Sequence, residues 1–249
     1  MARSNMGLPP DPLKAIFPLV VANLGTGLAS SFLGTGFFIR PDGMFLTAKH
    51  VLEDVSLPEG QDFAVVMLPA GLTVHRVSIV AFAEQFDIAL ARAEGIQDVF
   101  PLEIATKNAP VNFDVLTVEF SGTESRLLAD GRRGMWFTPY HRKGHVICYY
   151  TSTWPEPVAT SSLDLSFPAL RGASGAPVVA ERDGSVLGMV VANVERHLLP
   201  AQVERVEFGP DHREEVRYFL PVGKAIGWQH LGEFVQATLG DDAAVSTSD

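Results

Sequence analysis

The sequence predicts an all-β protein of two six-stranded antiparallel β-barrels packed together, followed by a short C-terminal α-helix. Two sets of six short apolar runs, broken by turn signals, lie along the 249 residues. A closed barrel suits strands of this spacing because closure removes exposed sheet edges. Hydrophobic residues make up 47% of the chain, which is enough to fill the cores of two small barrels.

The first predicted barrel covers about residues 14–105. The run after Lys14 has some features of a signal-peptide core, but Pro18 interrupts it and we interpret it as the first strand. Residues 1–13 are predicted to form a flexible arm, and residues 105–112 to cross between the two halves. The six runs of the first set are Ala15–Leu24, Gly34–Ile39, Met44–Ala48, Phe63–Leu68, Val74–Phe82 and Ile88–Ala91.

The second predicted barrel covers about residues 113–227. Residues 121–143 are predicted to form a long solvated hairpin with a local basic patch, and residues 195–215 a polar loop. Apolar residues at helical spacing predict an amphipathic helix over 228–239, and the acidic tail 240–249 is predicted to be disordered. The six runs of the second set are Val115–Phe120, Gly134–Thr138, His145–Tyr150, Ala176–Ala180, Val186–Val194 and Arg217–Val222.

The charge balance and the single cysteine exclude several classes of protein. With 19 basic and 29 acidic residues the formal net charge is −10, which argues against a nucleic-acid partner. No continuous run reaches the roughly 18–20 apolar residues that a membrane span needs, so no membrane partner is expected. Cys148 is the one cysteine, so no intrachain disulfide can form, and we interpret it as a small core residue. A cytoplasmic location is favoured over a secreted or periplasmic one.

A serine between glycines, at position 174, is the candidate nucleophile. Gly172 permits a strained turn that aims its own N–H and that of Ser174 at one point, as an oxyanion hole requires. Gly175 and Ala176 keep the far side of the turn thin, so that a substrate backbone can approach. The pattern alone is weak evidence for a catalytic serine, because glycine-serine turns are common. It indicates a nucleophile only if the sequence also supplies a base and an orienting acid elsewhere.

His50 and Asp87 supply that base and acid. His50 follows the apolar run Met44–Ala48 and therefore lies at the end of a predicted strand. Asp87 stands directly before an apolar run, where an unpaired carboxylate is costly, and the imidazole of His50 is the expected partner. Asp54 and Asp62 are the alternatives for this role.

The segments around these residues resemble the trypsin-like (chymotrypsin-fold) serine proteases. The closest style is that of the protease domain of the bacterial high-temperature-requirement proteases, without its PDZ domain. The resemblance spans roughly residues 30–235. It rests on four motifs in order, namely Gly34-Thr35-Gly36-Phe37 through Thr47-Ala48-Lys49-His50-Val51, then Asp87-Ile88-Ala89-Leu90, then Gly172-Ala173-Ser174-Gly175-Ala176-Pro177, and more weakly Tyr218-Phe219-Leu220-Pro221-Val222.

The resemblance implies one protease domain over residues 1–239 with a Ser-His-Asp triad. Ser174 would attack a carbonyl, His50 would transfer the proton, Asp87 would orient the imidazole, and the N–H groups of Gly172 and Ser174 would bind the oxyanion. Ala173 stands where digestive relatives carry an aspartate that pairs with a newly cut N-terminus. Activation through that ion pair is therefore excluded, and we expect control by loop ordering, a separate partner or self-association.

The resemblance also places the primary substrate pocket between two short segments. Neither segment contains Asp or Glu, so a preference for Lys or Arg is not expected, and a small or apolar residue before the cut is favoured instead. The lining residues are Pro168, Ala169 and Leu170 on one wall and Ala192, Asn193 and Val194 on the other.

The sequence thus predicts a serine endopeptidase that cleaves proteins or peptides through an acyl-enzyme. Two alternatives stay open: a catalytically idle binding module of the same fold, which the complete set of triad residues disfavours, and an esterase using the same triad. No metal or cofactor is expected. His141 and His145 have i, i+4 spacing, but no cysteine or carboxylate motif accompanies them.

Overall fold

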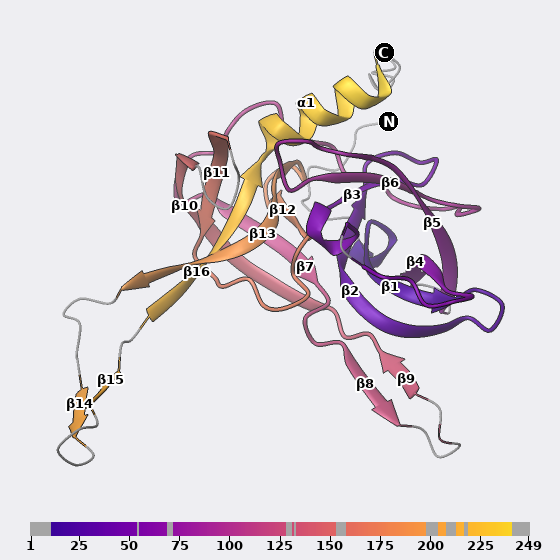
Figure 1. Cartoon of the computed structure of the whole chain (residues 1–249). Coiled ribbons are helices and arrows are strands. Elements are labelled where there is room, and N and C mark those ends of the chain that lie inside the picture. Colours follow the sequence, from indigo (N-terminus) through magenta and orange to yellow (C-terminus); the bar gives the residue numbers. More distant parts are fainter. Residues whose placement is uncertain are drawn as a thin grey trace.

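A computed structural model gives the fold in two closed six-stranded sheets that lie side by side (Figure 1). We call strands β1–β6 the N-terminal barrel, and strands β7, β10, β11, β12, β13 and β16 the C-terminal ring. The structure describes residues 11–53, 55–68, 72–127, 131, 133–152, 158–197, 204–207, 213–216 and 219–240.

The N-terminal barrel closes in the order β1-β2-β3-β6-β5-β4, and every pairing in it is antiparallel. Its centre holds the rings of Phe17, Phe38 and Phe45, with centroids 4.3 Å apart for the first two and 5.1 Å for Phe17 and Phe45. Each of the six predicted runs of this half overlaps one of its strands, so the all-β class and this barrel are confirmed. The strands are Ile16–Asn23 (β1), Leu28–Phe38 (β2), Met44–Thr47 (β3), Asp62–Met67 (β4), Thr73–Phe82 (β5) and Ala89–Ala93 (β6).

The C-terminal ring closes in the order β10-β11-β16-β13-β12-β7, again with antiparallel pairs only. One core cluster runs across the junction and joins Phe45 and Leu46 of the barrel to Phe120 and Met189 of the second half. The strands are Asp114–Glu119 (β7), Tyr140–Ser152 (β10), Thr160–Leu165 (β11), Pro177–Ala180 (β12), Val186–His197 (β13) and Phe219–Gly227 (β16).

The strand prediction for the second half was wrong in one place. The run Gly134–Thr138 does not enter the ring, because Arg133–Trp136 (β9) pairs with Glu124–Leu127 (β8) in a separate hairpin. The ring is completed instead by β11, which the sequence did not predict. Polar side chains break its apolar pattern, but they are buried and bonded: Asp164, for example, accepts the Tyr150 hydroxyl at 2.7 Å.

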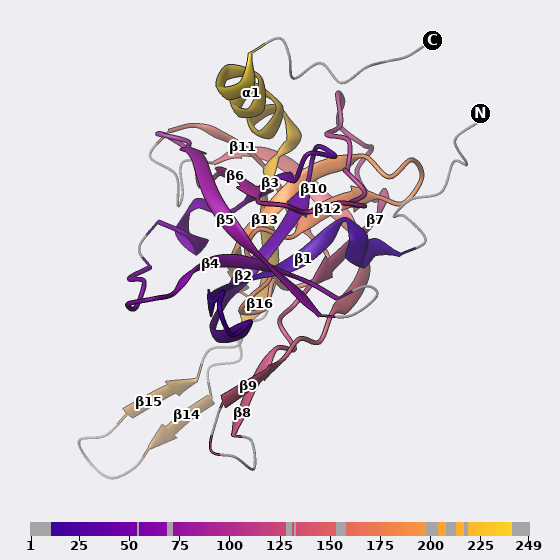
Figure 2. The ribbon, with the colours of Figure 1, turned by 90° about the vertical axis from the view of Figure 1, so that its right-hand side faces the viewer.

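Two hairpins project from the body of the molecule, and both views show them (Figures 1 and 2). The β8–β9 hairpin lies within the predicted hairpin of residues 121–143, although residues 140–143 already belong to β10. The predicted polar loop of residues 195–215 is corrected: β13 continues to His197, and a second hairpin follows, made by Glu204–Glu207 (β14) and Arg213–Val216 (β15). The predicted core residue Cys148 is half-buried on β10.

The helix prediction is confirmed in place and length, with α1 at Trp228–Leu239. Leu231 of α1 is fully buried, and Phe234, Val235 and Leu239 pack against the core cluster that crosses the junction. The predicted arm up to residue 10 and the tail from residue 241 lie outside the described residues. Among the helices that the structure describes, none is long and apolar enough to cross a membrane.

Candidate active site

His50 lies on a short helical turn directly after β3. The turn Lys49–Val51 is a single 3₁₀ turn, in which the Val51 N–H donates to the Ala48 carbonyl at 3.1 Å. Val51 points into the core and is 3% exposed, whereas the His50 side chain is 49% exposed. The buried neighbour therefore fixes the backbone while the imidazole stays accessible.

Asp87 lies on the short connection between β5 and β6, and its carboxylate holds His50 through two atoms. Oδ1 accepts the backbone N–H of His50 at 2.9 Å, and Oδ2 lies 2.6 Å from Nδ1 of the ring. A carboxylate at this distance favours the Nδ1–H tautomer, so Nε2 becomes the basic nitrogen. Of the two alternatives for the acid, Asp62 pairs with Arg76 at 3.0 Å, and Asp54 lies outside the described residues.

Ser174 is the second residue of the second of two consecutive tight turns, each of which contains a glycine. In the first turn the Ala173 N–H donates to the Leu170 carbonyl, and in the second the Ala176 N–H donates to the Ala173 carbonyl, both at 2.9 Å. Gly172 and Gly175 hold the third positions with φ of +97° and +86°. Both turns are therefore type II, a geometry that favours glycine at the third position.

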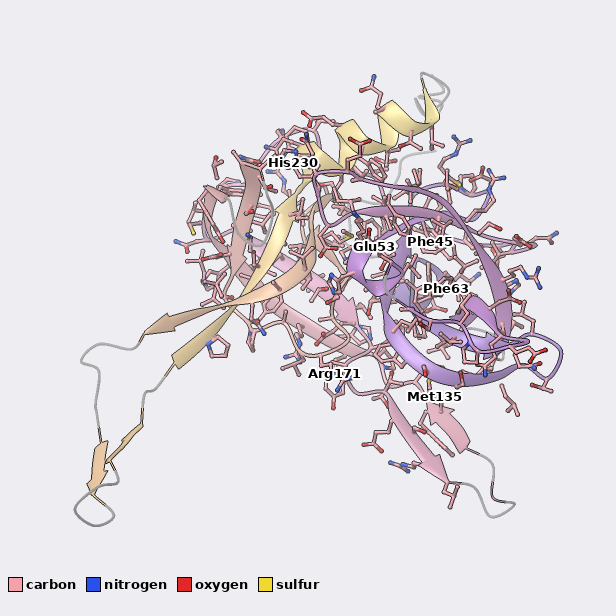
Figure 3. The ribbon with its side chains drawn as sticks, viewed as in Figure 1. Phe45, Glu53, Phe63, Met135, Arg171 and His230 are labelled. Atoms are coloured by element: carbon pink, nitrogen blue, oxygen red, sulfur yellow. The ribbon has the colours of Figure 1, made fainter. Side chains whose placement is uncertain are left out.

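Accessibility along these turns singles out the serine. The residues on either side, Gly172, Ala173, Gly175 and Ala176, are buried, whereas Ser174 is partly exposed. Arg171 is exposed too, and it lies at the edge of the junction on the side of the β8–β9 hairpin (Figure 3). Ser174 is thus the one hydroxyl-bearing residue that these turns present to a ligand.

Thr35 of β2 binds the serine turns to the N-terminal barrel. Its backbone N–H donates to the Ser174 carbonyl at 2.9 Å, and its hydroxyl donates to the Gly172 carbonyl at 2.8 Å. The Thr35 carbonyl in turn accepts the Thr47 hydroxyl at 2.8 Å. Thr35 is completely buried, so these bonds are shielded from water and hold the turns in one orientation.

The contacts of Gly175 and Gly34 bring the serine and histidine segments together. A Cβ on Gly175 would lie 2.1 Å from the Thr35 carbonyl oxygen and 3.1 Å from the Ala48 nitrogen, two residues before His50. A Cβ on Gly34 would lie 2.9 Å from Val51 Cγ2, next to His50, and 3.0 Å from the Ser174 carbonyl oxygen. The glycines of both motifs are required because the two backbones meet here.

The predicted pocket walls are linked by one side chain. Asn193 on β13 accepts the Ala169 N–H through Oδ1 at 2.7 Å, and its Nδ2 donates to the Ala169 carbonyl. Gly223 on β16 pairs with Asn193, and its N–H donates to the Phe167 carbonyl at 2.9 Å, which gives the two segments a second link. The amide bridge therefore fixes the separation of the two walls.

The remaining predicted lining residues border this bridge. Pro168 and Leu170 flank Ala169, and Leu170 is 42% exposed. Ala192 and Val194 flank Asn193 on β13, where they face Lys224 and Val222 of β16 in the ladder. Lys224 of β16 is fully buried, and the sequence analysis did not single it out.

No cluster of metal-binding side chains exists among the described residues. His141 and His145 lie on β10, opposite Val118 and Asp114 of β7.

A protein-family model described as the trypsin-like peptidase domain matches residues 34–189, more than half of the chain. The chain belongs to the trypsin-like peptidases. The match covers the segments of His50, Asp87 and Ser174 described above, and this peptidase is a serine protease. No curated protein matches the sequence.

Solved structures with low sequence identity share the fold of this peptidase. A variant of Rv3671c from M. tuberculosis H37Rv, in an inactive form, is 16% identical over 98% of this chain and 100% of the other, with a TM-score of 0.55. The HtrA-type protease AlgW with a decapeptide is 11% identical over 92% of this chain and 65% of the other, with a TM-score of 0.59. Deg5 is 17% identical over 72% and 80%, with a TM-score of 0.54.

Proposed function

We propose that this trypsin-like peptidase is a serine endopeptidase whose nucleophile is Ser174, with His50 as general base and Asp87 as the orienting acid. One observation carries the proposal: Asp87 holds both the backbone and the ring of His50, with 2.6 Å between Oδ2 and Nδ1. The partly exposed serine is bound to the same barrel through Thr35. The arrangement thus supplies the three groups that acyl transfer needs, namely a nucleophile, a general base and an acid that orients the base.

In the proposed reaction the Ser174 hydroxyl attacks the scissile carbonyl and gives its proton to His50 Nε2. The imidazolium then donates that proton to the leaving amine, and an acyl-enzyme on Ser174 remains. Water, deprotonated by the same imidazole, attacks the ester and releases the second product. Asp87 keeps Nδ1 protonated and favours the transient positive charge on the ring.

The oxyanion would be bound by the N–H groups of Gly172 and Ser174. The positive φ of Gly172 supports this role, because a change from a type II to a type I turn would nearly reverse the peptide that carries its N–H. One such donor typically contributes about 3–4 kcal/mol to transition-state stabilisation.

For the residue before the cut we propose a small or apolar side chain. The Asn193 amide bridge supports a small one, since a long side chain would have to pass between walls that two hydrogen bonds hold together. AlgW was solved with a bound peptide, and we extend peptide binding at the serine turns to the present chain.

Control by loop ordering or by a partner is part of the proposal. The ring of Phe32 lies against Gly172, where a Cβ would be 2.4 Å from Phe32 Cε1. Phe32, Met135 on β9 and Phe137 after it pack against the same small cluster of the barrel. A displacement at the base of the projecting β8–β9 hairpin (Figure 3) would therefore move Phe32 and, through Phe32, the turn that contains Gly172.

Cleavage of an unfolded protein tests the proposal. The substrate is a protein kept unfolded by reduction and carboxymethylation. Mass spectrometry should show new N-termini in this substrate after incubation with the wild-type chain and none after incubation with Ser174→Ala. Ser185→Ala, which changes a serine in the turn before β13, should cleave like the wild type. Hydrolysis of a nitrophenyl ester without any protein cleavage would instead indicate an esterase, and neither activity would indicate a binding module.

A further inference from the structure

The first turn of α1 contacts the loop that carries Asp87. The rings of His230 on α1 and Phe86 are stacked, with centroids 4.2 Å apart and planes inclined by 28°. His230 lies at the start of α1, where the helix leaves the C-terminal ring (Figure 3). Phe86 lies on the loop between β5 and β6 of the barrel and immediately precedes Asp87. The contact therefore joins α1 to the loop that carries the proposed orienting acid.

His230 is itself held in a defined state. Its Nε2 accepts the backbone N–H of Ser161 on β11 at 2.8 Å, and its side chain is only 14% exposed. Because a backbone N–H can only donate, Nε2 is unprotonated and the neutral ring carries its hydrogen on Nδ1. Nδ1 is buried without a hydrogen bond, and Oε2 of Glu233 lies 3.5 Å away. The ring therefore presents a neutral, fixed face to Phe86.

The Asp87 loop is anchored at its two ends, where Ala83 and Ile88 are buried in the core cluster. It is closed by the Ala83 N–H, which donates to the Ile88 carbonyl at 2.9 Å, and by the Ile88 N–H, which donates to the Phe86 carbonyl at 2.8 Å. The residues before Phe86 at the tip, Glu84 and Gln85, are exposed. Consecutive Cα atoms are about 3.8 Å apart, so a displacement of Phe86 moves Asp87 as well.

We propose that His230 is a positioning residue that holds Phe86, and through it Asp87, against His50. The inference rests on the proposed function, because it assigns a role toward the proposed acid. A ring stack at this place restricts sliding of the loop while leaving both carboxylate oxygens of Asp87 to His50. Small errors in the placement of a catalytic group have large effects on rate, so a modest contact suffices.

Three variants separate positioning from folding. His230→Ala removes both the stack and the acceptor for Ser161, and should lower kcat roughly tenfold with little change in KM. His230→Phe keeps a stacking ring but loses the acceptor, so it should lose stability like the alanine variant while keeping kcat near the wild-type value. Gln236→Ala, at an exposed position of the same helix, should change neither.

A double-mutant cycle with Asp87→Ala is the decisive experiment. The readout is the rate of Ser174 labelling by a fluorophosphonate in the full chain. If His230 acts through the acid, His230→Ala slows labelling about tenfold in the wild-type background and not at all in the Asp87→Ala background. An equal loss in both backgrounds, or a His230→Phe variant as slow as His230→Ala, would overturn the inference. Absence of labelling in the wild type would instead overturn the proposed function.

Discussion

Among the contacts between the N-terminal barrel and the second half of the chain, two support segments that carry proposed catalytic residues. Thr35 of the barrel holds the Gly172–Gly175 turns through hydrogen bonds at 2.8 and 2.9 Å. His230 of the second half holds the Asp87 loop through a ring stack at 4.2 Å. We call these contacts the threonine brace and the histidine brace.

The two braces differ in chemistry because the segments they hold have different tasks. In the proposed reaction the serine turns must present backbone N–H groups in one direction, and directional, buried hydrogen bonds can fix a peptide plane. The Asp87 loop presents a side chain that already binds His50 through both oxygens. A stacked ring behind it suffices for this task, and it does not compete for those oxygens.

The largest effect on the threonine brace is expected from Gly175→Ala. The new Cβ would lie 2.1 Å from the Thr35 carbonyl oxygen, and the backbone φ of +86° is unfavourable for alanine. We expect labelling of Ser174 to fall by roughly a hundredfold or more, since the turn must move.

Gly27→Ala is the matched control for that experiment. Gly27 has a similar φ of +67° but has no atom within 4 Å of an added Cβ. It should therefore lose about 1–2 kcal/mol of stability without losing activity. Equal activity in Gly175→Ala and the wild type would contradict the close contact between the halves.

Thr35→Val weakens the same brace without adding bulk. It leaves the Gly172 carbonyl without its buried donor, at a cost of about 1–3 kcal/mol in the free energy of unfolding. Labelling should slow by roughly tenfold as the oxyanion turn loses its orientation. Thr47→Val is the matched control, because it removes a hydrogen bond to the Thr35 carbonyl but none to the serine turns. Urea unfolding should show a loss of stability similar to that of Thr35→Val, whereas the rate of Ser174 labelling should fall less.

Asn193→Gly tests the pocket walls, which neither brace holds. Without the amide bridge to Ala169, large apolar residues before the cut should be accepted roughly tenfold better relative to alanine. A peptide library read by mass spectrometry gives the comparison, and the rate of fluorophosphonate labelling serves as the control. An unchanged profile would show that the bridge does not limit the pocket, and a profile dominated by Lys or Arg would contradict the proposed preference.

The smallest effect is expected at Asp183, in the turn between β12 and β13 and away from both braces. The Ser185 hydroxyl, 2.7 Å from Oδ1, lowers the pKa of Asp183 below its ordinary value of 3.8. A lowered pKa stabilises the fold above that ordinary value, and the contribution disappears as the pH falls through the folded-state pKa. The Tm of Ser185→Ala should therefore fall slightly below that of the wild type at pH 7. The two Tm values should converge as the pH falls below the folded-state pKa of Asp183, and the two proteins should be equally active at neutral pH.

Much of this architecture could be predicted from the sequence, because the strands of the N-terminal barrel are apolar runs with clear turns between them. Strand β11 could not, since Ser162 and Asp164 break the apolar pattern. Asp164 is buried with a partner from the neighbouring strand, the Tyr150 hydroxyl of β10, and no local pattern reveals that contact. The glycines around Ser174 were predictable from local turn chemistry, and both have the positive φ that a type II turn requires.

The braces depend on contacts between residues far apart in the chain, which no local pattern reveals. Thr35 stands in a motif that the sequence singled out, but its hydroxyl contact with Gly172 follows from the way the two halves pack. His230 had no apparent role, because its stacking partner Phe86 lies in the other half. Asn193 was predicted as a wall residue, while its side-chain bridge to Ala169 emerges only from the paired walls.

We propose that Ser174, His50 and Asp87 act as one catalytic unit at the junction of barrel and ring. Intact-mass measurement of fluorophosphonate labelling tests it most directly. We expect one adduct per chain, located on Ser174. It should form roughly a thousandfold or more slower in His50→Ala and in Asp87→Ala, and combining the two changes should slow it no further. Labelling on another residue, or labelling of Ser174 at an undiminished rate without His50, would contradict it.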